Sequence, residues 1–429
     1  MMILFRTPTH RLFVACILLF PLLSACTAFS AWDTSWQRGD APPPAPLAVE
    51  RSPVPAASEM PAGEIPVAAP QLPDTVDPPL PDPGRPPVVS QGDISYENTT
   101  ITEDVVWSGS VLVRGYLVIA SPATVRIEPG TVVRFMKSLL SRQTPRLVVM
   151  GRLHCNGSAG QPVRFTPNVA RPERGDWGGI LLLSSEKRNQ LDHVLIEGAT
   201  AGIEAGFSTL SATDVAIRRC TVGMLLRDSS ASLSAASVDD CETGLELLDS
   251  EVDLRDSALS SNQRGIVARR TTLVLLAVSL RENQQSGVTA LDCRVRFTSC
   301  QLAANGGGGA HLAESEGNIS GSRFVANRGV GLELVSSRLK VQGSLFTATA
   351  GDGMRVNDGR SLVWGNSFEG NSGYNLAISG HDRIVAVGNW WGSDQESSIA
   401  AKLLDGTKDP RGGRVEFFPW LVQRPVNVP

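Results

Sequence analysis

Between residues 217 and 391 an apolar side chain returns every 21 to 23 positions. This apolar column consists of Ile217, Val238, Leu259, Leu280, Leu302, Phe324, Phe346, Phe368 and Trp391. A column of glycines keeps the same step, as does a column of Cys, Asn and Thr three residues after most of the apolar positions. Self-similarity at a fixed short period indicates a stack of equivalent units, each of which contacts only its neighbours.

Each repeat contains three short runs in which apolar and polar residues alternate. In the repeat at residues 331–349, Leu332 and Leu334 mark the first run. Leu339 and Val341 mark the second run, and a third run follows. Alternation over a few residues predicts β-strands, and strands one repeat apart would pair in parallel at about 4.8 Å. Because parallel crossovers are overwhelmingly right-handed, the predicted fold class is all-β, a single-stranded right-handed parallel β-helix with three sides.

The repeated columns are expected to form continuous ladders inside the β-helix. Each fully buried apolar side chain contributes about 1.5–3 kcal/mol. An aromatic stack is predicted at Phe324, Phe346, Phe368 and Trp391. An asparagine ladder is predicted in the turn after the third strand, at Asn262, Asn283, Asn305, Asn327 and Asn371. Asparagine tolerates the left-handed backbone of such a turn, and the glycine that opens the next coil is expected to relieve the bend.

Five cysteines remain in the predicted β-helix: Cys155, Cys220, Cys241, Cys293 and Cys300. Cys220 and Cys241 occupy the same column on adjacent coils, about 4.8 Å apart, which is within the range for a disulfide. They form either a disulfide or part of a buried cysteine ladder. The chain has no C-x-x-C motif and no His/Cys cluster, so no metal site is expected.

The first residues have the pattern of an export signal. Arg6 and Arg11 precede an apolar run from Leu12 to Leu23, which is too short for a stable membrane anchor. The tetrapeptide at residues 23–26, Leu-Ser-Ala-Cys, resembles a bacterial lipobox. That resemblance implies a signal peptide at residues 1–25 and lipidation of Cys26, which would anchor the protein to a membrane. An ordinary secretory signal is the alternative.

A proline-rich segment follows and is expected to act as a tether over residues 26–92. It holds 16 of the 28 prolines and few large apolar residues, so it cannot bury a core. The residue after Cys26 is Thr27 rather than the aspartate that retains enterobacterial lipoproteins in the inner membrane, which favours the outer membrane. The formal charge is −4 and the sequence contains no basic block, which argues against nucleic acid as a partner.

Several strings resemble those of exported bacterial β-helix proteins of the pectate-lyase-like superfamily. The opening strings are Ile-Glu-Pro-Gly-Thr-Val-Val-Arg-Phe at residues 127–135 and Asp-Trp-Gly-Gly-Ile at 176–180. The closing strings are Gly-Asn-Trp-Trp-Gly at 388–392 and Phe-Pro-Trp-Leu at 418–421. The resemblance implies a β-helix at residues 93–392 and a C-terminal cap and tail at 393–429. In that cap, a short helix is predicted from Asp394 through Leu404, followed by a strand from Val415 to Leu421.

Catalytic members of the superfamily use clustered carboxylates, often with calcium, and an Arg or Lys base. The outward positions of the first strand show no acidic row. Asp249, Asp253 and Asp256 come closest to a cluster, and we interpret them as solvated turn charges. The triplet at residues 381–383 (His381, Asp382 and Arg383) resembles the core of the alginate C5-epimerase motif, but Ser-Gly replaces the Asp-Pro that should precede it.

The favoured function is that of a non-catalytic, membrane-anchored module of the cell envelope. Its third strand carries small or polar outward residues, which suits shallow contact with a polysaccharide or an envelope protein. The alternative is a polysaccharide lyase, hydrolase or epimerase on the same fold. No cofactor is expected, and calcium is expected only if the protein acts on carbohydrate. The expected partners are the membrane, through the lipid anchor, and a polysaccharide or envelope protein.

Overall fold

A computed structural model describes residues 94–137, 144–185, 188–357, 360–410, 412–426 and 428. It also places two short strands, β1 (Phe5–Arg6) and β2 (Leu12–Phe13), which pair antiparallel with each other. Apart from the backbone of these two strands, the predicted signal peptide, Cys26 and the proline-rich tether lie outside the described residues. Among the described residues, none belongs to a helix that is both long and apolar enough for a membrane span.

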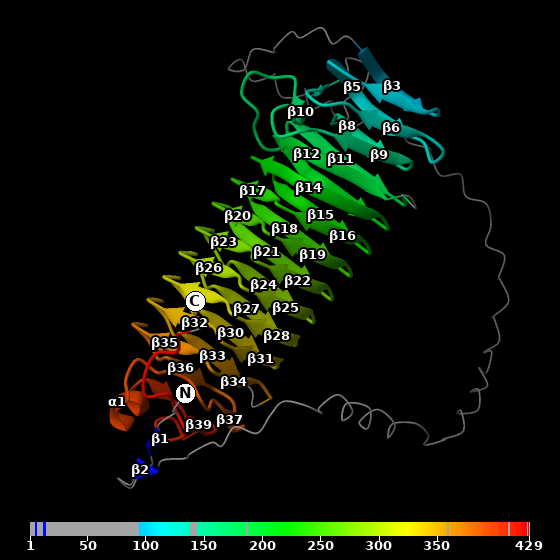
Figure 1. Cartoon of the computed structure of the whole chain (residues 1–429). Coiled ribbons are helices and arrows are strands. Elements are labelled where there is room, and N and C mark those ends of the chain that lie inside the picture. The colour runs from blue at the N-terminus through cyan, green and yellow to red at the C-terminus, as the bar shows by residue number, and fades with distance from the viewer. Residues whose placement is uncertain are drawn as a thin grey trace, which may run out of the picture. The chain divides into compact units, whose positions relative to one another are not determined.

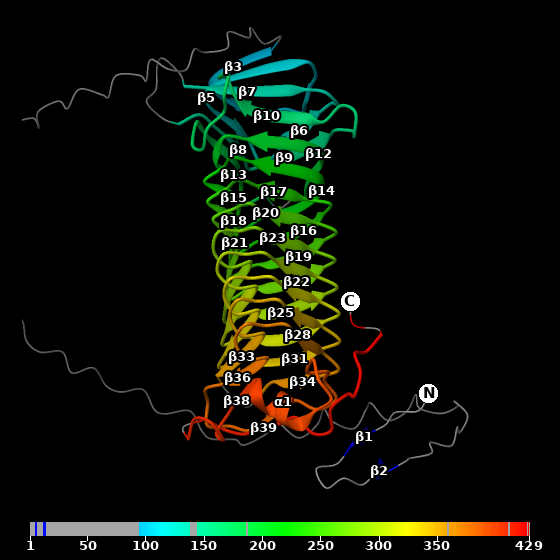
Figure 2. The ribbon, with the colours of Figure 1, turned by 90° about the vertical axis from the view of Figure 1, so that its left-hand side faces the viewer.

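From Ile94 onwards the chain forms a stack of coils, seen from two directions in Figures 1 and 2. Four long strands turn a corner and serve two faces each. They are β3 (Ile94–Ile101), β5 (Ser110–Ile119), β12 (Asn189–Glu197) and β14 (Thr209–Arg218). The remaining strands each belong to one of three faces, which we number in the order in which the chain of one coil visits them.

The strands of face 1 carry the first apolar run of each coil. They are β8 (Arg146–Val149), β11 (Trp177–Leu183), β13 (Ala199–Gly206), β15 (Val222–Arg227), β18 (Thr243–Leu248), β21 (Arg264–Arg269), β24 (Val288–Leu291), β27 (Ala310–Ala313), β30 (Leu332–Val335), β33 (Met354–Asn357), β36 (Leu376–Ile378) and β38 (Leu403–Leu404).

Face 2 holds the second run of each coil. Its strands are β4 (Val105–Trp107), β6 (Thr124–Ile127), β9 (Arg152–Asn156), β16 (Ser230–Ser234), β19 (Glu251–Arg255), β22 (Thr272–Leu276), β25 (Arg294–Thr298), β28 (Glu316–Ser320), β31 (Arg338–Gln342), β34 (Leu362–Trp364), β37 (Ile384–Val385) and β39 (Val415–Glu416).

Face 3 holds the third run of each coil. Its strands are β7 (Val132–Met136), β10 (Val163–Pro167), β17 (Ser237–Asp239), β20 (Ala258–Ser260), β23 (Ser279–Arg281), β26 (Gln301–Ala303), β29 (Arg323–Val325), β32 (Leu345–Thr347) and β35 (Ser367–Glu369).

All pairings within this stack are parallel, and each joins a strand to its equivalent one coil away. Along face 3, for example, Leu302 pairs with Phe324 and Phe324 pairs with Phe346. The result is a right-handed parallel β-solenoid of about 13 turns with almost no helix, which confirms the predicted fold class.

The inward columns form the core. Phe324, Phe346, Phe368 and Trp391 stack with ring centroids 4.8 Å apart at each step. This spacing equals the distance between neighbouring strands, so each ring lies over its copy on the next coil. The three phenylalanines are fully buried, and the apolar columns of the other faces are buried in the same way. Burial is therefore repeated coil by coil along the axis.

The corners repeat a two-residue unit: a left-handed residue followed by a buried polar one. After face 3, Glu282 (φ 57°) precedes Asn283 and Ala304 (φ 55°) precedes Asn305. The left-handed position is thus the residue before the asparagine, which corrects the expectation that asparagine itself supplies it. The asparagine instead supplies hydrogen bonds inside the corner.

Each asparagine links three coils. Asn305 Oδ1 accepts hydrogen bonds from the backbone N–H and the side-chain amide of Asn283, at 3.1 and 3.0 Å. Its own amide donates to the Leu280 carbonyl at 3.1 Å and to Asn327 Oδ1 at 3.0 Å. These bonds satisfy backbone groups that the turn leaves without a strand partner.

A second ladder, of hydroxyls and one thiol, follows the corner between faces 1 and 2. Its members include Ser208, Ser229, Ser250, Thr271, Cys293, Ser315 and Ser337. Ser229 Oγ, for instance, accepts from the Ser208 N–H at 3.1 Å and donates to the carbonyl two residues before it, Arg227, at 2.7 Å. This ladder was not predicted, although the 21-residue step of its first serines is visible in the sequence.

The glycine column is required for a different reason from the one expected. The φ angles of Gly287 and Gly309 are not in the left-handed region. A Cβ on Gly309 would lie 2.4 Å from the carbonyl oxygen of Gly331 and 2.8 Å from Phe324 Cδ1. Close approach between coils, rather than relief of a bend, therefore requires glycine here. The column ends at Gly353, because Asn375 occupies the equivalent place on the next coil.

The C-terminal cap differs in detail from the prediction. Helix α1 covers only Glu396–Ala401, and its N-cap is Gln395 without a side-chain cap bond, rather than Asp394. The expected return strand is shorter, since β39 ends at Glu416. Strands β38 and β39 pair with β36 and β37, so the cap continues the stack as a last, irregular coil. Because the chain then pairs in parallel with the preceding coil, the helix ends earlier than predicted.

The five cysteines are free thiols, and each is buried. The disulfide considered for Cys220 and Cys241 is not formed, and the two belong instead to a ladder of small polar side chains. Their sulfurs donate to the carbonyls two residues earlier, Arg218 at 3.3 Å and Asp239 at 3.4 Å. Cysteine thus takes the place and the bonding pattern that serine takes at the other corners.

Candidate functional site

The acidic residues predicted as the nearest approach to a cluster do not converge. Asp249 lies in the corner before β19 and Asp256 in the corner after it, both with left-handed backbone, whereas Asp253 lies on the strand between them. Arg270 binds Asp249 at 2.6 Å, and this hydrogen bond lowers the pKa of Asp249. Arg255 binds Asp253 at 2.9 Å. These are solvated ion pairs on separate segments.

The triplet His381, Asp382 and Arg383 lies in the loop between β36 and β37, and all three side chains are exposed. Arg383 forms an ion pair with Glu416 at 2.8 Å. The lining of two hollows on face 2 includes none of the three residues. The loop therefore places the triplet on the coil before the last, in contact with the cap.

Face 1 carries a row of paired charges near its C-terminal end. His311 lies 3.0 Å from Glu333, Glu333 lies 3.6 Å from Arg355, and Arg355 binds Asp352 at 2.8 Å. Each of the first three residues is one coil from the next, so the row follows the register of β27, β30 and β33. The two hollows on face 2 do not reach this row. We interpret it as a ladder that neutralises its own charges.

The outward residues of face 3, which were predicted to form a flank for shallow binding, are only partly accessible. Ser367 is fully buried and Leu345 is 3% exposed. Ser367 bridges to Trp390, and Arg424 of the C-terminal tail binds Glu369 at 3.1 Å. The tail therefore covers the C-terminal end of face 3, which weakens the case for a continuous binding flank there.

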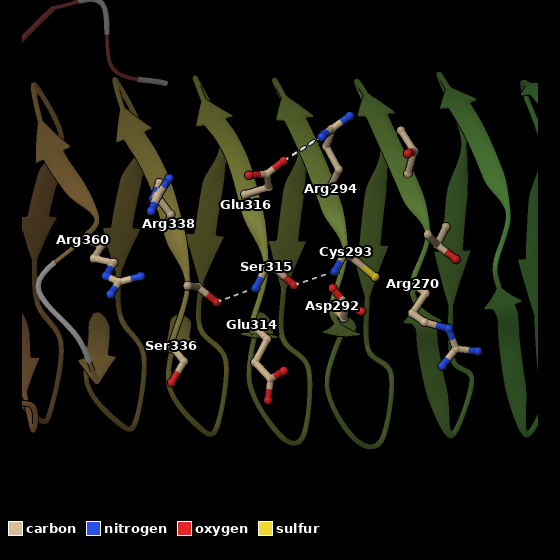
Figure 3. Close-up of a pocket in the computed structure, with 13 residues that line it drawn as sticks. Arg270, Asp292, Cys293, Arg294, Glu314, Ser315, Glu316, Ser336, Arg338 and Arg360 are labelled. Carbon is tan, nitrogen blue, oxygen red and sulfur yellow. Dashed lines mark hydrogen bonds and ion pairs between the residues drawn. The ribbon is translucent and has the colours of Figure 1, made fainter. Parts of the chain in front are cut away.

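A depression lies on face 2 of the described structure. Two adjoining hollows of about 600 and 520 Å³ share Thr272, Arg294, Glu316, Arg338 and Arg360. They extend over β22, β25, β28 and β31, and Figure 3 shows the part that reaches the corner. We call the second hollow and its cations the basic groove, defined by Arg294, Arg296, Arg338, Lys340 and Arg360 around Asn318.

Positive charge dominates the basic groove. Its lining holds five cations and one carboxylate, Glu316, which binds Arg294 at 2.8 Å (Figure 3). No described residue is a partner for the side chains of Arg296, Arg338 or Lys340, and all three are exposed. The net formal charge of the whole chain is −4. The groove is therefore a local reversal of the protein's charge.

Gly317 and Asn318 of β28 line the floor of the basic groove. Gly317 occupies an inward position between Val295 and Leu339 with a φ of 142°, and a Cβ there would stand 1.8 Å from the Val295 carbonyl oxygen. The next residue, Asn318, pairs in register with Arg296 on one side and Lys340 on the other. Its Oδ1 is buried without a hydrogen-bond partner. Such a group is uncommon in folded proteins.

The rim of the first hollow runs along the corner between faces 1 and 2. Asp292 and Glu314 lie there with left-handed backbone, and Figure 3 shows both below the strands that carry Arg294 and Glu316. The acidic rim and the basic groove are thus side by side. Among the residues that the structure describes, no group of three or more His, Cys, Asp or Glu side chains could hold a metal ion.

The basic groove was not predicted from the sequence, because its cations form no linear block. Arg294 and Arg296 share one strand, and Arg338 and Lys340 share another, 44 residues later. Two coils of the solenoid bring these pairs close together. The signal that could have revealed the groove is an Arg-x-Arg and an Arg-x-Lys at outward positions of the second run.

Two family models match the chain. A right-handed beta helix region matches residues 243–390, and a pectate-lyase-like beta helix domain matches residues 99–216. The two matches agree with the right-handed parallel β-helix of the structure and with the resemblance of the opening and closing strings to the pectate-lyase-like superfamily. No curated protein sequence matches.

Similar solved structures include two epimerases and a phage protein. The periplasmic alginate epimerase AlgG is 13% identical, with 75% of this chain and 78% of that chain covered and a TM-score of 0.44. The A-module of the mannuronan C-5 epimerase AlgE4 from Azotobacter vinelandii is 10% identical, with 73% and 91% covered and a TM-score of 0.35. Tailspike protein 3 of bacteriophage CBA120 is 10% identical, with 71% and 54% covered and a TM-score of 0.28. Similarity at this level carries no inference about activity.

Proposed function

We propose that this protein is a non-catalytic, membrane-anchored module of the cell envelope that binds polysaccharide along face 2. The observation that carries the proposal is the basic groove, an open depression whose cations Arg296, Arg338 and Lys340 have no partner among the described residues. Neighbouring cations without partners repel one another. The free energy of such a surface therefore falls most when a ligand binds to it. Rigid strands hold these groups in fixed positions, as binding without rearrangement requires.

The competing proposal, a polysaccharide lyase, hydrolase or epimerase, receives less support from the groove. Such chemistry uses a pair of carboxylates or a carboxylate with a base around the reacting sugar. The basic groove holds one carboxylate, Glu316, and that carboxylate is in an ion pair with Arg294. The acids Asp292 and Glu314 line only the neighbouring hollow, at the corner.

Binding and catalysis are separated by incubating the full chain with envelope polysaccharides, with and without calcium. We expect polymer to be retained by the protein and recovered with unchanged length, linkage and sugar composition. New reducing ends, unsaturated ends or epimerised sugars would establish the enzyme instead. The variant R296Q/R338Q/K340Q should lose binding, whereas Arg323→Gln, an exposed cation on face 3, should retain it.

Localisation is part of the same proposal. A lipid on Cys26 and a proline-rich tether would hold the β-helix away from the membrane surface, within reach of an extended polymer. The outer membrane is the proposed site, with no cofactor required. Cys26→Ser should move the protein from the membrane fraction to the soluble fraction and abolish incorporation of labelled fatty acid. Unchanged membrane retention would exclude the lipid anchor.

A further inference from the structure

We infer that face 2 is self-complementary, and that two copies of this chain form a dimer through it with their solenoid axes antiparallel. The two-fold axis runs along β22, so a strand on one side of β22 faces the strand equally far on the other side of β22 in the partner. The inference goes beyond the proposed function and does not depend on it. A second copy and a polymer would compete for the cations of the basic groove.

The register of face 2 defines which residues meet in such a dimer. Parallel pairing places Glu251 of β19 and Arg294 of β25 on opposite sides of Thr272 of β22, one strand away on each side. An axis along β22 therefore brings Glu251 of one copy over Arg294 of the other. In the same way, it brings Asp253 over Arg296. Because the interface is isologous, each of these pairs occurs twice.

The two sides of β22 carry opposite charges at these positions. Glu251 is exposed, and no described residue forms an ion pair with it. Arg296 likewise has no such partner in its own chain. Arg294 binds Glu316 of its own chain at 2.8 Å, and in the dimer it would lie between two carboxylates. Opposite charges across an interface speed association and fix the register of the two partners.

The central strand β22 has the composition that a two-fold axis requires. Its outward residues Thr272, Val274 and Leu276 carry no charge, and Leu276 is 36% exposed. On the axis each residue meets its own copy, so a charged side chain there would repel itself. Val274 and Leu276 would instead remove apolar surface from water in the dimer.

An exposed aromatic side chain and the first hollow lie equally far from β22, on opposite sides. Phe207 precedes Thr209 of β14, three strands before β22, and Ser336 precedes Arg338 of β31, three strands after it. Phe207 is 66% exposed with a φ of 51°, which is unusual for a bulky residue. Ser336 and Arg338 line the first hollow (Figure 3). The Phe207 ring of one copy would enter this hollow beside the partner's cation.

Like charges oppose one another at the corner before face 2. Asp228 lies two strands before β22 and Glu314 two strands after it, and both are exposed. The axis brings these two carboxylates together at the rim of the interface. This register therefore predicts that removal of the Asp228 charge strengthens the dimer, whereas removal of the Glu251 charge weakens it.

The test measures the mass of the full chain in a non-ionic detergent by sedimentation at several concentrations. We expect a dimer that dissociates on dilution and on addition of salt. Glu251→Lys should weaken association by roughly tenfold or more, whereas Asp228→Lys, which changes the net charge equally, should strengthen it. Phe207→Ala should weaken association by roughly tenfold. The circular dichroism spectrum, which reports the fold, should be the same for all three variants.

A cysteine on the axis locates β22 in the interface. Val274→Cys should meet its own copy, so a mild oxidant should join two chains by one disulfide. Ser232→Cys, two strands away, would lie about 19 Å from its own copy and should not cross-link. The double variant S232C/N318C should cross-link again, because these positions face each other in the dimer. The five native thiols are buried.

The outcomes separate this inference from the proposed function. A mass of one chain up to about 100 µM would overturn the dimer. Equal effects of Glu251→Lys and Asp228→Lys, or a Val274→Cys variant that does not cross-link, would overturn face 2 as the interface. A dimer without polysaccharide binding would leave this inference in place and overturn only the proposed function. Polysaccharide binding by a chain that stays monomeric would overturn only this inference.

Discussion

At the scale of single residues, the small buried polar side chains stabilise the corners between the faces of this protein. Asparagine, serine, threonine and cysteine occupy equivalent corner positions, and each accepts or donates to backbone groups that have no strand partner. The residue before them takes the left-handed backbone, as Ala304 and Ala326 do. A non-glycine residue in that region costs free energy, and the buried hydrogen bonds of the next residue offset it.

Asn305→Ala tests the ladder. The change removes bonds to the N–H and amide of Asn283, the Leu280 carbonyl and Asn327, and it leaves buried groups unsatisfied. We expect a loss of about 2–4 kcal/mol of unfolding free energy, measured by denaturant titration. Gln284→Ala, one residue from the ladder but exposed, should change it by less than about 0.5 kcal/mol. Equal effects for the two would mean that the ladder contributes little.

The buried thiols predict a pH dependence. Burial raises the pKa of Cys300 from the ordinary 9.0 to about 11, and it also raises the pKa of Cys155 and Cys293. The folded state therefore holds these protons more tightly than the unfolded state. The resulting stability is fully present below about pH 9 and is lost as the pH rises towards 11.

We expect the melting temperature to fall between pH 9 and pH 11, with up to about 2 kcal/mol lost through Cys300. Cys300→Ser should melt with a shallower pH dependence, because serine fills the equivalent corners and does not titrate there. An identical slope for this variant and the unchanged protein would assign the effect to other groups.

At the scale of elements, the spacing of coils explains which structural features could be predicted from the sequence. The aromatic stack and the parallel register followed from the 21- to 23-residue period, because one period equals one coil. The extent of α1 and β39 did not follow, because strand pairing with β36 and β37 decides it rather than local propensity. The basic groove could not be read from a linear pattern, since Arg296 and Lys340 become neighbours only through two turns of the solenoid.

Gly309→Ala tests the distance between coils. The added Cβ would lie 2.4 Å from the carbonyl oxygen of Gly331, on the next coil, and 2.8 Å from the buried Phe324 ring. We expect a loss of about 2–4 kcal/mol, seen as a lower melting temperature. Gly160→Ala is the control, because nothing lies within 4 Å of its Cβ, and it should change stability by less than about 1 kcal/mol. A neutral Gly309→Ala would refute close approach as the reason for the glycine column.

At the scale of the whole β-helix, the stack behaves as a one-dimensional array. Each strand pairs with its equivalents one coil before and one coil after, so the coils between are interchangeable in register. The two ends differ from the middle: the last coil carries α1, β38 and β39. This organisation separates folding, which depends on the inward columns, from binding, which depends on outward residues such as those of the basic groove.

Removing one whole coil tests this organisation. Deletion of residues 245–265 joins Gly244 to Ile266, which pairs with Leu245 and so fills its place in the register. We expect a folded protein with an unchanged β-type circular dichroism spectrum per residue and a loss of about 1–3 kcal/mol, in proportion to the residues removed. Deletion of residues 245–254 shifts the faces against one another and should prevent folding. Folding of both deletions, or of neither, would contradict the array.

Binding of polysaccharide on face 2 is tested at the level of whole strands by hydrogen exchange of the full chain with and without a bound polymer such as polygalacturonate. We expect slower exchange on β25, β28 and β31, the strands that hold the basic groove, and no change on face 1 around β27 and β30. Slower exchange confined to face 1, or to face 3, would place the ligand elsewhere and refute the basic groove as the binding site.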